Sequence, residues 1–351
     1  MTAARSFMIG GRRVGADAPP LIIAEMSCNH MGSFERAVAI LEAAAAAGAG
    51  AVKLQTLRPE GITLDSDQPG FRISGGLWDG RRLFDLYREA QTPWEWHEPL
   101  FRRGRELGVA VFTSPFDLGA VEFLESLGAP AYKVASFEAV DIPLIEAVAK
   151  TGKPVIISTG MANLEEIGEA VRAARGAGCE DLALLYCVSG YPTPAEEANL
   201  RTLRDMAERF DVVIGLSDHT TGTAVAVAAV ALGAALVEKH VTLSRSDPSL
   251  DAAFSLEPAE LKQLCESAEA AAKALGRVRY EIKPSEQPSL QWRRSLFVVE
   301  DLLAGAAFSA QNVRSLRPAL GLPPRHLREL LGRKAAVAIA RGTPLTWDLV
   351  S

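Results

Sequence analysis

The sequence predicts an α/β protein built around a (β/α)8 barrel, with a small second domain after it. Short apolar runs of strand length recur eight times, and segments with a helical pattern lie between them. The runs are almost continuously apolar, which is typical of parallel strands that helices cover. Eight such units over roughly 250–280 residues favour a closed barrel over an open doubly wound sheet.

The elements follow one another regularly along the chain. The predicted strands are residues 21–25, 51–56, 109–114, 131–136, 154–159, 182–187, 212–219 and 235–240. The helical segments commonly end at glycine, which suits the left-handed position that follows a helix. One connection, from Leu57 to Thr92, is unusually long, and Thr92-Pro93 is expected to start the next helix. A long loop at this face of a barrel is often a lid.

The chain changes character after Gly276. Residues 277–292 are polar, contain two prolines and have no sustained period, so we interpret them as a linker that follows a catalytic domain of residues 1–276. Residues 293–351 are expected to form the small second domain. Its predicted elements are strands near 296–299, 313–316 and 335–339 and a helix near 326–332.

Composition argues against several classes of function. The net charge is −6, so nothing favours nucleic acid or an anionic membrane as a partner. The N-terminus lacks the apolar core of a signal peptide, and the four cysteines are scattered without a CxxC pair, so we expect a cytoplasmic protein with reduced thiols. A GxGxxG fingerprint after the first strand, a Walker-type loop and a legible Ser-His-Asp arrangement are absent. The sequence therefore supports no nicotinamide oxidoreductase, kinase or serine hydrolase.

Polar residues stand at the ends of the predicted strands, which is the face of a barrel where active sites lie. This pattern indicates an enzyme. The strand-end residues are Glu25, Lys53, Gln55, Ser114, Lys133, Ser136, Ser158, Ser189, Tyr191, His219 and His240.

His219 and His240 end the last two predicted strands. Adjacent strands lie about 4.8 Å apart, so the two imidazoles can reach one cation. Imidazole suits metals such as manganese, iron and zinc, and a site with two histidines leaves positions open for substrate. Alternatively, both histidines form hydrogen bonds that polarise the substrate directly. The other histidines lie in loop or helical contexts and are interpreted as structural or surface groups.

Lys53 and Lys133 lie within apolar strands, where lysine is rare unless it is paired or functional. If both point inward, they form a cationic floor that suits a phosphate or carboxylate. Hydroxyl groups near the same rim come from Ser114, Ser136, Ser158, Thr159 and Ser217. Alternatively, each lysine is neutralised by a structural acid such as Glu238.

Three further polar residues face the same mouth. Glu25 can act as a general base or orient water, or it can simply neutralise Lys53. Tyr191 and Asp251 lie in later loops and suit the hydroxyl groups of a sugar.

Several motifs occur in the order found in one known family. They are AEMSCNHMGS (24–33), VKLQT (52–56), YKVAS (132–136), ISTGMA (157–162), GLSDHT (215–220), EKHVTL (238–243) and VRSLRP (313–318). On these motifs the chain resembles the sialic acid synthase family over nearly its whole length, and residues 293–351 resemble the antifreeze-like (SAF) domain of that family. GGLWDG (75–80) and TPWEWH (92–97) are most similar to the members that make pseudaminic acid.

The resemblance implies a reaction. Phosphoenolpyruvate condenses with an open-chain amino-sugar aldehyde, water adds, and phosphate leaves by C–O cleavage. In the pseudaminic acid branch the sugar is 2,4-diacetamido-2,4,6-trideoxy-L-altrose, and the product serves surface polysaccharide or flagellin glycosylation. The resemblance also implies a divalent metal, typically Mn²⁺ with Mg²⁺ or Co²⁺ as alternatives, and a domain-swapped homodimer.

The resemblance assigns roles by position. Glu25, His219 and His240 would be catalytic, and the two histidines would bind the metal. The phosphoenolpyruvate site would contain Lys53, Ser114, Lys133, Ser136, Ser158 and Ser217. The sugar site would contain Gln55, Ser189, Tyr191, Asp251 and Arg317, with Arg317 reaching the active site of the other subunit.

A few positions depart from the family pattern. Ala319 replaces the first glycine of a Pro-Gly-x-Gly segment, and Pro248-Ser249-Leu250 replace a glycine-rich turn in a substrate-facing loop. Tyr186 replaces a common histidine. Ser189 stands where sialic acid synthases often have asparagine, which argues against N-acetylmannosamine as the substrate.

Other functions stay open on the sequence alone. An N-acetylneuraminic or legionaminic acid synthase would share every catalytic residue, so only the sugar-facing loops discriminate. A non-catalytic sugar-binding barrel protein would have little reason to keep buried lysines and paired histidines, which are costly to bury. A barrel metallohydrolase would need more carboxylate or histidine ligands than the strand ends supply.

Overall fold

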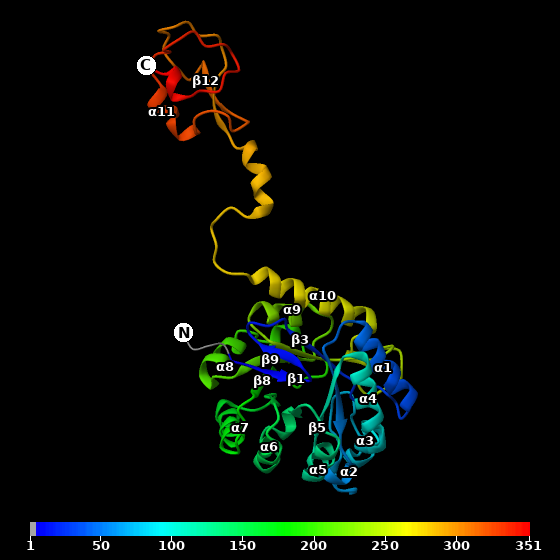
Figure 1. Ribbon diagram of the computed structural model, residues 1–351. Coiled ribbons are helices and arrows are strands. Elements are labelled where there is room, and N and C mark those ends of the chain that lie inside the picture. The colour runs from blue at the N-terminus through cyan, green and yellow to red at the C-terminus, as the bar shows by residue number, and fades with distance from the viewer. Residues whose placement is uncertain (1–4) are drawn as a thin grey trace. The chain divides into compact units, whose positions relative to one another are not determined.

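Eight parallel strands close into a barrel in the first part of the chain, and helices surround it (Figure 1). The computed structural model describes residues 5–351, which form two compact units that meet in sequence at Gly276 and Arg277. The predicted barrel is therefore confirmed. Among the helices of residues 5–351, none combines the length and the apolarity needed to cross a membrane.

The barrel strands follow the predicted order. They are β3 (Leu21–Glu25), β4 (Ala51–Thr56), β5 (Ala110–Pro115), β6 (Tyr132–Val134), β7 (Val155–Ser158), β8 (Leu182–Cys187), β9 (Val213–Asp218) and β10 (Leu236–His240). β10 pairs with β3 and closes the barrel. β9 ends at Asp218, so His219 lies one residue beyond the strand in which it was predicted.

The covering helices are α1 (Phe34–Ala46), α4 (His97–Leu107), α5 (Leu118–Ser126), α6 (Ile142–Ala149), α7 (Leu164–Gly176), α8 (Thr202–Phe210), α9 (Ala224–Ala231) and α10 (Pro258–Leu275). Several begin at a side chain that accepts a hydrogen bond from a free backbone N–H of the first turn. Ser33 caps α1, Asp117 caps α5, and Asn163 forms a capping box with Glu166 at α7. These caps fix where each helix begins after its strand.

An antiparallel hairpin, β1 (Ser6–Ile9) and β2 (Arg12–Gly15), closes the amino end of the barrel. Phe7, Ile9 and Val14 are buried and pack against residues at the starts of the barrel strands, such as Leu21 and Ala51. This hairpin was not predicted from the sequence, because its strands have four residues each and one carries two arginines. It leaves the carboxyl ends of the strands as the open face.

The long connection between β4 and α4 is partly helical. It contains α2 (Pro59–Ile62) and α3 (Leu83–Ala90). The prediction that Thr92 caps the next helix is wrong, because a 3-10 turn (Trp94–Trp96) precedes α4. The Thr92 hydroxyl instead lies 3.1 Å from Nε2 of His30.

The second unit has its own core, which includes Leu296, Val298, Phe308, Leu330 and Leu345. It contains the antiparallel strands β11 (Ser295–Val298) and β12 (Val313–Leu316) and the short helix α11 (Leu327–Leu330). Two predicted strands and the helix are therefore present. The third predicted strand, 335–339, forms only isolated bridges, at Ala335 and Ile339.

Candidate active site

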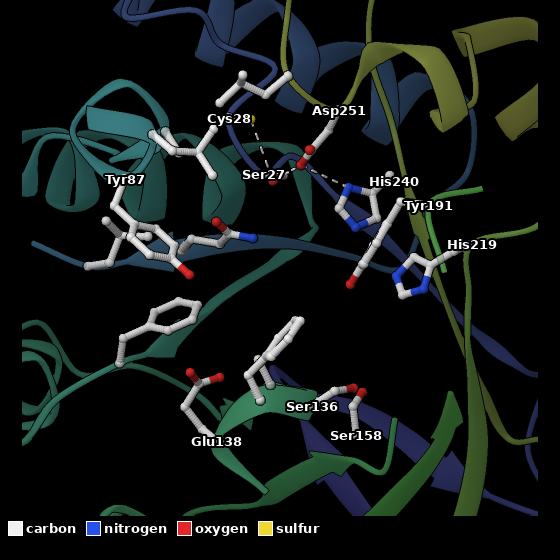
Figure 2. A pocket seen from close by; sticks show the side chains of 18 of the residues that line it. Ser27, Cys28, Tyr87, Ser136, Glu138, Ser158, Tyr191, His219, His240 and Asp251 are labelled. Atoms are coloured by element: carbon white, nitrogen blue, oxygen red, sulfur yellow. Dashed lines mark hydrogen bonds and ion pairs between the residues drawn. The ribbon is translucent and has the colours of Figure 1, made fainter. Parts of the chain in front are cut away.

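A cavity of about 360 Å³ lies at the carboxyl ends of the barrel strands (Figure 2). Most of the residues predicted for the site line it. They are Lys53, Gln55, Lys133, Ser136, Ser158, Tyr191, Ser217, His219, His240 and Asp251. Strand alternation explains why Lys53 and Gln55 of β4 both line it, since residues two apart on one strand face the same side of the barrel wall.

Glu25 lies behind the cavity, where it pairs with Lys53. Oε2 of Glu25 lies 2.5 Å from Nζ of Lys53. Oε1 accepts hydrogen bonds from Nε2 of Gln55 at 3.2 Å and from the backbone N–H of Ser27 at 3.0 Å. Nζ of Lys53 also donates to Oγ of Ser114 at 3.2 Å, so Ser114 supports the lysine from the neighbouring strand.

Lys53 and Lys133 are both buried, with 3% and 1% of their surface exposed, and both line the cavity. Burial lowers the pKa of Lys53, but the carboxylates of Glu238 and Glu25 outweigh burial and hold the pKa above its ordinary value. For Lys133, burial and the neighbouring Lys53 together keep the pKa below its ordinary value. An anion in the cavity would relieve this repulsion between two ammonium groups.

Three serines complete the anion-binding surface. Oγ of Ser158 is buried and has no hydrogen-bond partner within residues 5–351. Oγ of Ser136 accepts the backbone N–H of Gly160 at 3.2 Å, which leaves its own hydrogen free to donate. Oγ of Ser217 donates to Glu238 at 3.2 Å. The lysines and hydroxyls together suit a ligand with a phosphate or carboxylate group.

Glu238 belongs to this site, although the sequence analysis considered it only as a structural acid. It lines the cavity, and its Oε1 lies 3.8 Å from Nζ of Lys53. Burial raises its pKa, but Lys133 and Lys53 outweigh burial, so the pKa lies below its ordinary value. Strand alternation could have predicted this position, since Glu238 and His240 are two residues apart on β10 and therefore face the same side. Lys239, between them, points the other way and pairs with Asp218 at 2.9 Å.

His219 and His240 lie side by side, with ring centroids 5.3 Å apart. Nδ1 of His219 lies 3.0 Å from the carbonyl oxygen of Val188, so it must carry the hydrogen of this bond. Nδ1 of His240 lies 3.5 Å from Oδ2 of Asp251. The carbonyl behind His219 fixes the tautomer in which Nε2 keeps its lone pair. The Asp251 carboxylate favours the same tautomer of His240 by its charge, although no regular hydrogen bond joins the two within residues 5–351.

The two rings fit a catalytic metal site in which the protein supplies only part of the ligand set. In the tautomer with the hydrogen on Nδ1, each ring can coordinate a metal through Nε2. The distance between the ring centroids is compatible with one shared ion. Residues 5–351 contain no group of three or more His, Cys, Asp or Glu side chains placed to hold a metal. A metal at His219 and His240 would therefore keep positions open for water or substrate oxygen.

Asp251 was predicted to contact the sugar, and the structure places it against His240 (Figure 2). Ser27 Oγ donates to Oδ2 of the same carboxylate. Burial raises the pKa of Asp251, but His240 and Ser27 outweigh burial, so the pKa lies below its ordinary value. An ionised carboxylate in this position orients the imidazole.

Two predicted sugar-site residues lie outside the cavity lining. Ser189 lies behind it, with Oγ 3.9 Å from Sγ of Cys187. Arg317 belongs to the second unit, where it is exposed. Tyr191, by contrast, lines the cavity and packs over His219, with ring centroids 4.4 Å apart.

The long connection supplies further cavity residues, of which only Trp78 lies in a motif of the family resemblance, GGLWDG (75–80). The lining includes Ile73, Trp78, Leu83, Leu86, Tyr87 and Ala90. Trp78 packs on Tyr191, and its Nε1 donates to the carbonyl oxygen of Leu250 at 3.3 Å. The segment therefore contacts loops that follow β8 and β10.

The remaining histidines are structural, as expected. Nε2 of His97 lies 2.7 Å from Oγ1 of Thr56, and both residues are buried. Burial lowers the pKa of His30 and of His97 to about 4, so both rings are neutral at pH 7. His326 lies in the second unit, 3.2 Å from Glu329.

Comparison with protein families identifies two matching segments. Residues 40–280 match the NeuB family, and residues 293–351 match the SAF domain. The chain is 43% identical to a pseudaminic acid synthase of Helicobacter pylori, over 94% of this chain and 97% of the relative. It is 42% identical to a pseudaminic acid synthase of Campylobacter jejuni, over 94% and 96%. An N,N'-diacetyllegionaminic acid synthase of Campylobacter jejuni is 35% identical, over 90% and 95%.

Two solved structures also superpose on this chain over most of its length. An N-acetylneuraminic acid synthetase from Leptospira borgpetersenii superposes with a TM-score of 0.73 at 31% identity, covering 82% of this chain and 95% of the other. The spore coat polysaccharide biosynthesis protein SpsE of Bacillus subtilis superposes with a TM-score of 0.68 at 33% identity, covering 99% of both chains. The fold is thus shared with both of these proteins.

Proposed function

Since this chain belongs to the NeuB family, we propose that it is a pseudaminic acid synthase. It would condense phosphoenolpyruvate with 2,4-diacetamido-2,4,6-trideoxy-L-altrose and water, giving pseudaminic acid and phosphate. The observation that carries the chemistry is the cavity in which two buried lysines lie beside a histidine pair. The identity of 42–43% with synthases of this acid, against 35% with a legionaminic acid synthase, favours this sugar.

Phosphoenolpyruvate would bind at the lysines and serines. Lys53 and Lys133 supply positive charge for its phosphate and carboxylate, and Ser136 and Ser158 supply hydroxyl donors. Ser217 would join them by turning its hydroxyl hydrogen from Glu238 to the ligand. Ser114 would act through Lys53, which it supports by a hydrogen bond. Burial of this site strengthens each charge interaction and keeps bulk water away from the enol.

The sugar aldehyde would approach the histidines. A divalent cation, for which we propose Mn²⁺, would be held by His219 and His240 and supplies Lewis-acid polarisation of the aldehyde oxygen. Asp251 keeps His240 oriented, and Tyr191 covers His219. Gln55 and Tyr191 would contact the sugar from the cavity wall.

The bond changes require one base and one acid. Carbon 3 of phosphoenolpyruvate attacks the aldehyde carbon, whose oxygen gains a proton. Water adds to carbon 2 and loses one proton to the base. The hydroxyl group so formed loses its remaining proton to the departing phosphate as it becomes the keto oxygen, and the bond between carbon 2 and the phosphate oxygen breaks. Glu25 is proposed to orient this water and to accept its proton, because its carboxylate adjoins Lys53 at the floor of the cavity.

Arg317 and the SAF domain would complete the site in a homodimer. We propose that Arg317 of one subunit reaches the sugar in the other subunit, as the family resemblance implies. Its exposure within the second unit leaves the guanidinium free for such a contact.

Phosphate release measured with phosphoenolpyruvate, Mn²⁺ and each candidate aldehyde tests the proposal. The diacetamido-trideoxy altrose should give the highest kcat/KM. Preference for N-acetylmannosamine or for the legionaminic acid precursor would contradict the choice of sugar. A protein that binds the sugar but releases no phosphate with any aldehyde would be a sugar-binding barrel instead.

A further inference from the structure

The cavity has a second, apolar end whose residues the proposed mechanism does not use. Ile73, Leu83, Tyr87 and Ala90 of the long connection line it, together with Phe116 after β5 and Phe137 after β6. Figure 2 shows Tyr87 and Glu138 on one side of the cavity and His219 and His240 on the opposite side. A ligand that reacts at the histidines would place its far end against this apolar wall.

Two polar groups interrupt the apolar wall. The Tyr87 hydroxyl and the Glu138 carboxylate are directed into the cavity (Figure 2). Oε2 of Glu138 is buried and has no hydrogen-bond partner in the described part of the chain. Burial raises the pKa of Glu138 to about 7. A buried acceptor without a partner is costly, so a ligand donor is expected to satisfy it.

We propose that this end of the cavity binds the acetamido group on carbon 4 and the methyl group at carbon 6 of the sugar. Glu138 accepts the amide N–H, and the Tyr87 hydroxyl donates to the acetyl carbonyl oxygen. The methyl groups pack against apolar side chains such as Leu83 and Ala90. Tyr87 and Glu138 are then specificity-determining residues, an assignment that rests on the proposed function and deepens it.

The position of the reacting carbon supports this orientation. The aldehyde is carbon 1, so carbons 4 and 6 lie toward the end of the sugar that is remote from the histidines. N-acetylmannosamine carries hydroxyl groups at both positions. Its 6-hydroxyl would lose water and meet an apolar wall, and its 4-hydroxyl would leave Tyr87 without a carbonyl acceptor. Unpaired polar groups of this kind give an enzyme strong discrimination.

Replacement of Tyr87 by phenylalanine tests the assignment, because it removes one oxygen atom and keeps the ring. In the full-length enzyme with Mn²⁺, the KM for the diacetamido-trideoxy altrose should rise about tenfold, which is the effect of one lost hydrogen bond. The KM for phosphoenolpyruvate should stay within about twofold, since the hydrogen bonds of Lys53, Ser136 and Ser217 do not involve Tyr87. Tyr280→Phe is the matched control, because Tyr280 is 96% exposed in the second unit.

Glu138 allows a second comparison. Glu138→Gln keeps an oxygen acceptor, whereas Glu138→Met keeps only the volume. The KM for the sugar should rise by at least tenfold in Glu138→Met and clearly less in Glu138→Gln. An equal effect of both variants, or a parallel loss of affinity for phosphoenolpyruvate, would assign Glu138 a structural role. Either result would overturn the proposal that Glu138 accepts the amide N–H of the sugar.

The wild-type preference separates the inference from the proposed function. If wild-type enzyme prefers N-acetylmannosamine, the proposed function itself fails. If it prefers the diacetamido-trideoxy altrose and the Tyr87→Phe and Glu138→Met variants keep that preference undiminished, the function stands and the assignment of this end is wrong. Variants that lose discrimination between the two sugars would support the assignment.

Discussion

The side chains at the barrel mouth are oriented by groups behind them. His219 donates to the Val188 carbonyl at 3.0 Å, and Asp251 lies 3.5 Å behind His240. Glu25 holds Lys53 in the same way at the floor of the cavity. Because hydrogen bonds and ion pairs already hold these side chains, they lose little conformational entropy when a ligand binds to their imidazole nitrogen or ammonium group.

Removal of one imidazole tests the metal assignment. His240→Ala should lower Mn²⁺ affinity and abolish phosphate release while the fold stays intact, because the barrel core does not depend on this ring. Isothermal titration calorimetry measures the Mn²⁺ affinity, a phosphate-release assay measures turnover, and far-ultraviolet circular dichroism checks the fold. Chelation of wild-type enzyme should also abolish turnover, and Mn²⁺ should restore it. His326→Ala is the control, and undiminished activity of His240→Ala would refute the assignment.

Gly160 is a residue whose lack of a side chain matters. A Cβ there would lie 2.2 Å from Oγ of Ser189 and 2.8 Å from Oγ of Ser136. Gly160→Ala should therefore displace Ser136 and raise the KM for phosphoenolpyruvate roughly tenfold. Steady-state kinetics with varied phosphoenolpyruvate checks this. Gly176→Ala serves as the control, because a Cβ there has no neighbour within 4 Å. Unchanged kinetics of Gly160→Ala would exclude Ser136 as a phosphoenolpyruvate ligand.

At the scale of elements, two histidines fasten both ends of the long connection. His97 at the start of α4 bonds Thr56 at the end of β4, and His30 before α1 bonds Thr92 at the end of the segment. The segment between these points supplies the apolar end of the cavity. Its position over the site therefore depends on two neutral buried imidazoles.

Stability should fall as the pH is lowered through the range in which these histidines titrate. Burial lowers the pKa of His30 and of His97 from 6.5 to about 4. Below pH 6.5 the unfolded chain binds protons that the folded chain does not, so stability is lost down to about pH 4. The loss is roughly 3 kcal/mol for each histidine over the whole window. Urea unfolding midpoints at pH 7.5 and pH 5 measure it.

A variant isolates this effect from other titrations. His97→Gln keeps a side chain that can bond Thr56 but removes one titrating group. Its stability should be lower at pH 7.5 and should depend less on pH than that of wild-type protein. The same pH dependence in both proteins would show that His97 does not titrate as inferred.

The sequence predicts the barrel well because each strand is a local apolar run and each ends in a polar residue. It also places Lys53, Lys133 and the histidine pair on one face, since strand position alone decides this. The place of Glu238 was harder to predict, because an acid next to Lys239 in sequence suggests a local ion pair. Strand alternation puts the two side chains on opposite sides of β10, so Glu238 faces the cavity and Lys239 does not. The role of Tyr87 depends on the path of the long connection, which no local pattern determines. Glu138 lies in the turn after β6, two residues beyond Ser136, where no sequence pattern separates it from a surface acid.

At the scale of the whole molecule, the chain consists of two units with separate hydrophobic cores. All proposed site residues except Arg317 belong to the barrel unit. Arg317 can therefore contact a sugar in a barrel only if its second unit reaches that barrel. The second unit can belong to the same subunit or to another subunit. The proposed domain-swapped dimer selects the second possibility.

Complementation between two impaired variants distinguishes these possibilities. His240→Ala removes a barrel group, and Arg317→Ala should lower kcat/KM for the sugar about ten- to a hundredfold through loss of a charged hydrogen bond. In a swapped mixed dimer, the intact barrel of the Arg317→Ala subunit receives Arg317 of the partner subunit. Co-expression should then restore up to about a quarter of wild-type activity, since half the dimers are mixed and one site in each is complete.

The controls for this experiment decide how its outcome is interpreted. Arg328→Ala, a change at another exposed arginine of the second unit, should keep full activity by itself. Assayed alone under the conditions used for the mixture, His240→Ala should be inactive and Arg317→Ala should keep at most about a tenth of wild-type activity. If mixed dimers form and activity does not return, Arg317 acts within its own subunit, because an arginine supplied across the interface must rescue the neighbouring barrel. The swapped arrangement would then be wrong, even though the barrel chemistry could stand unchanged.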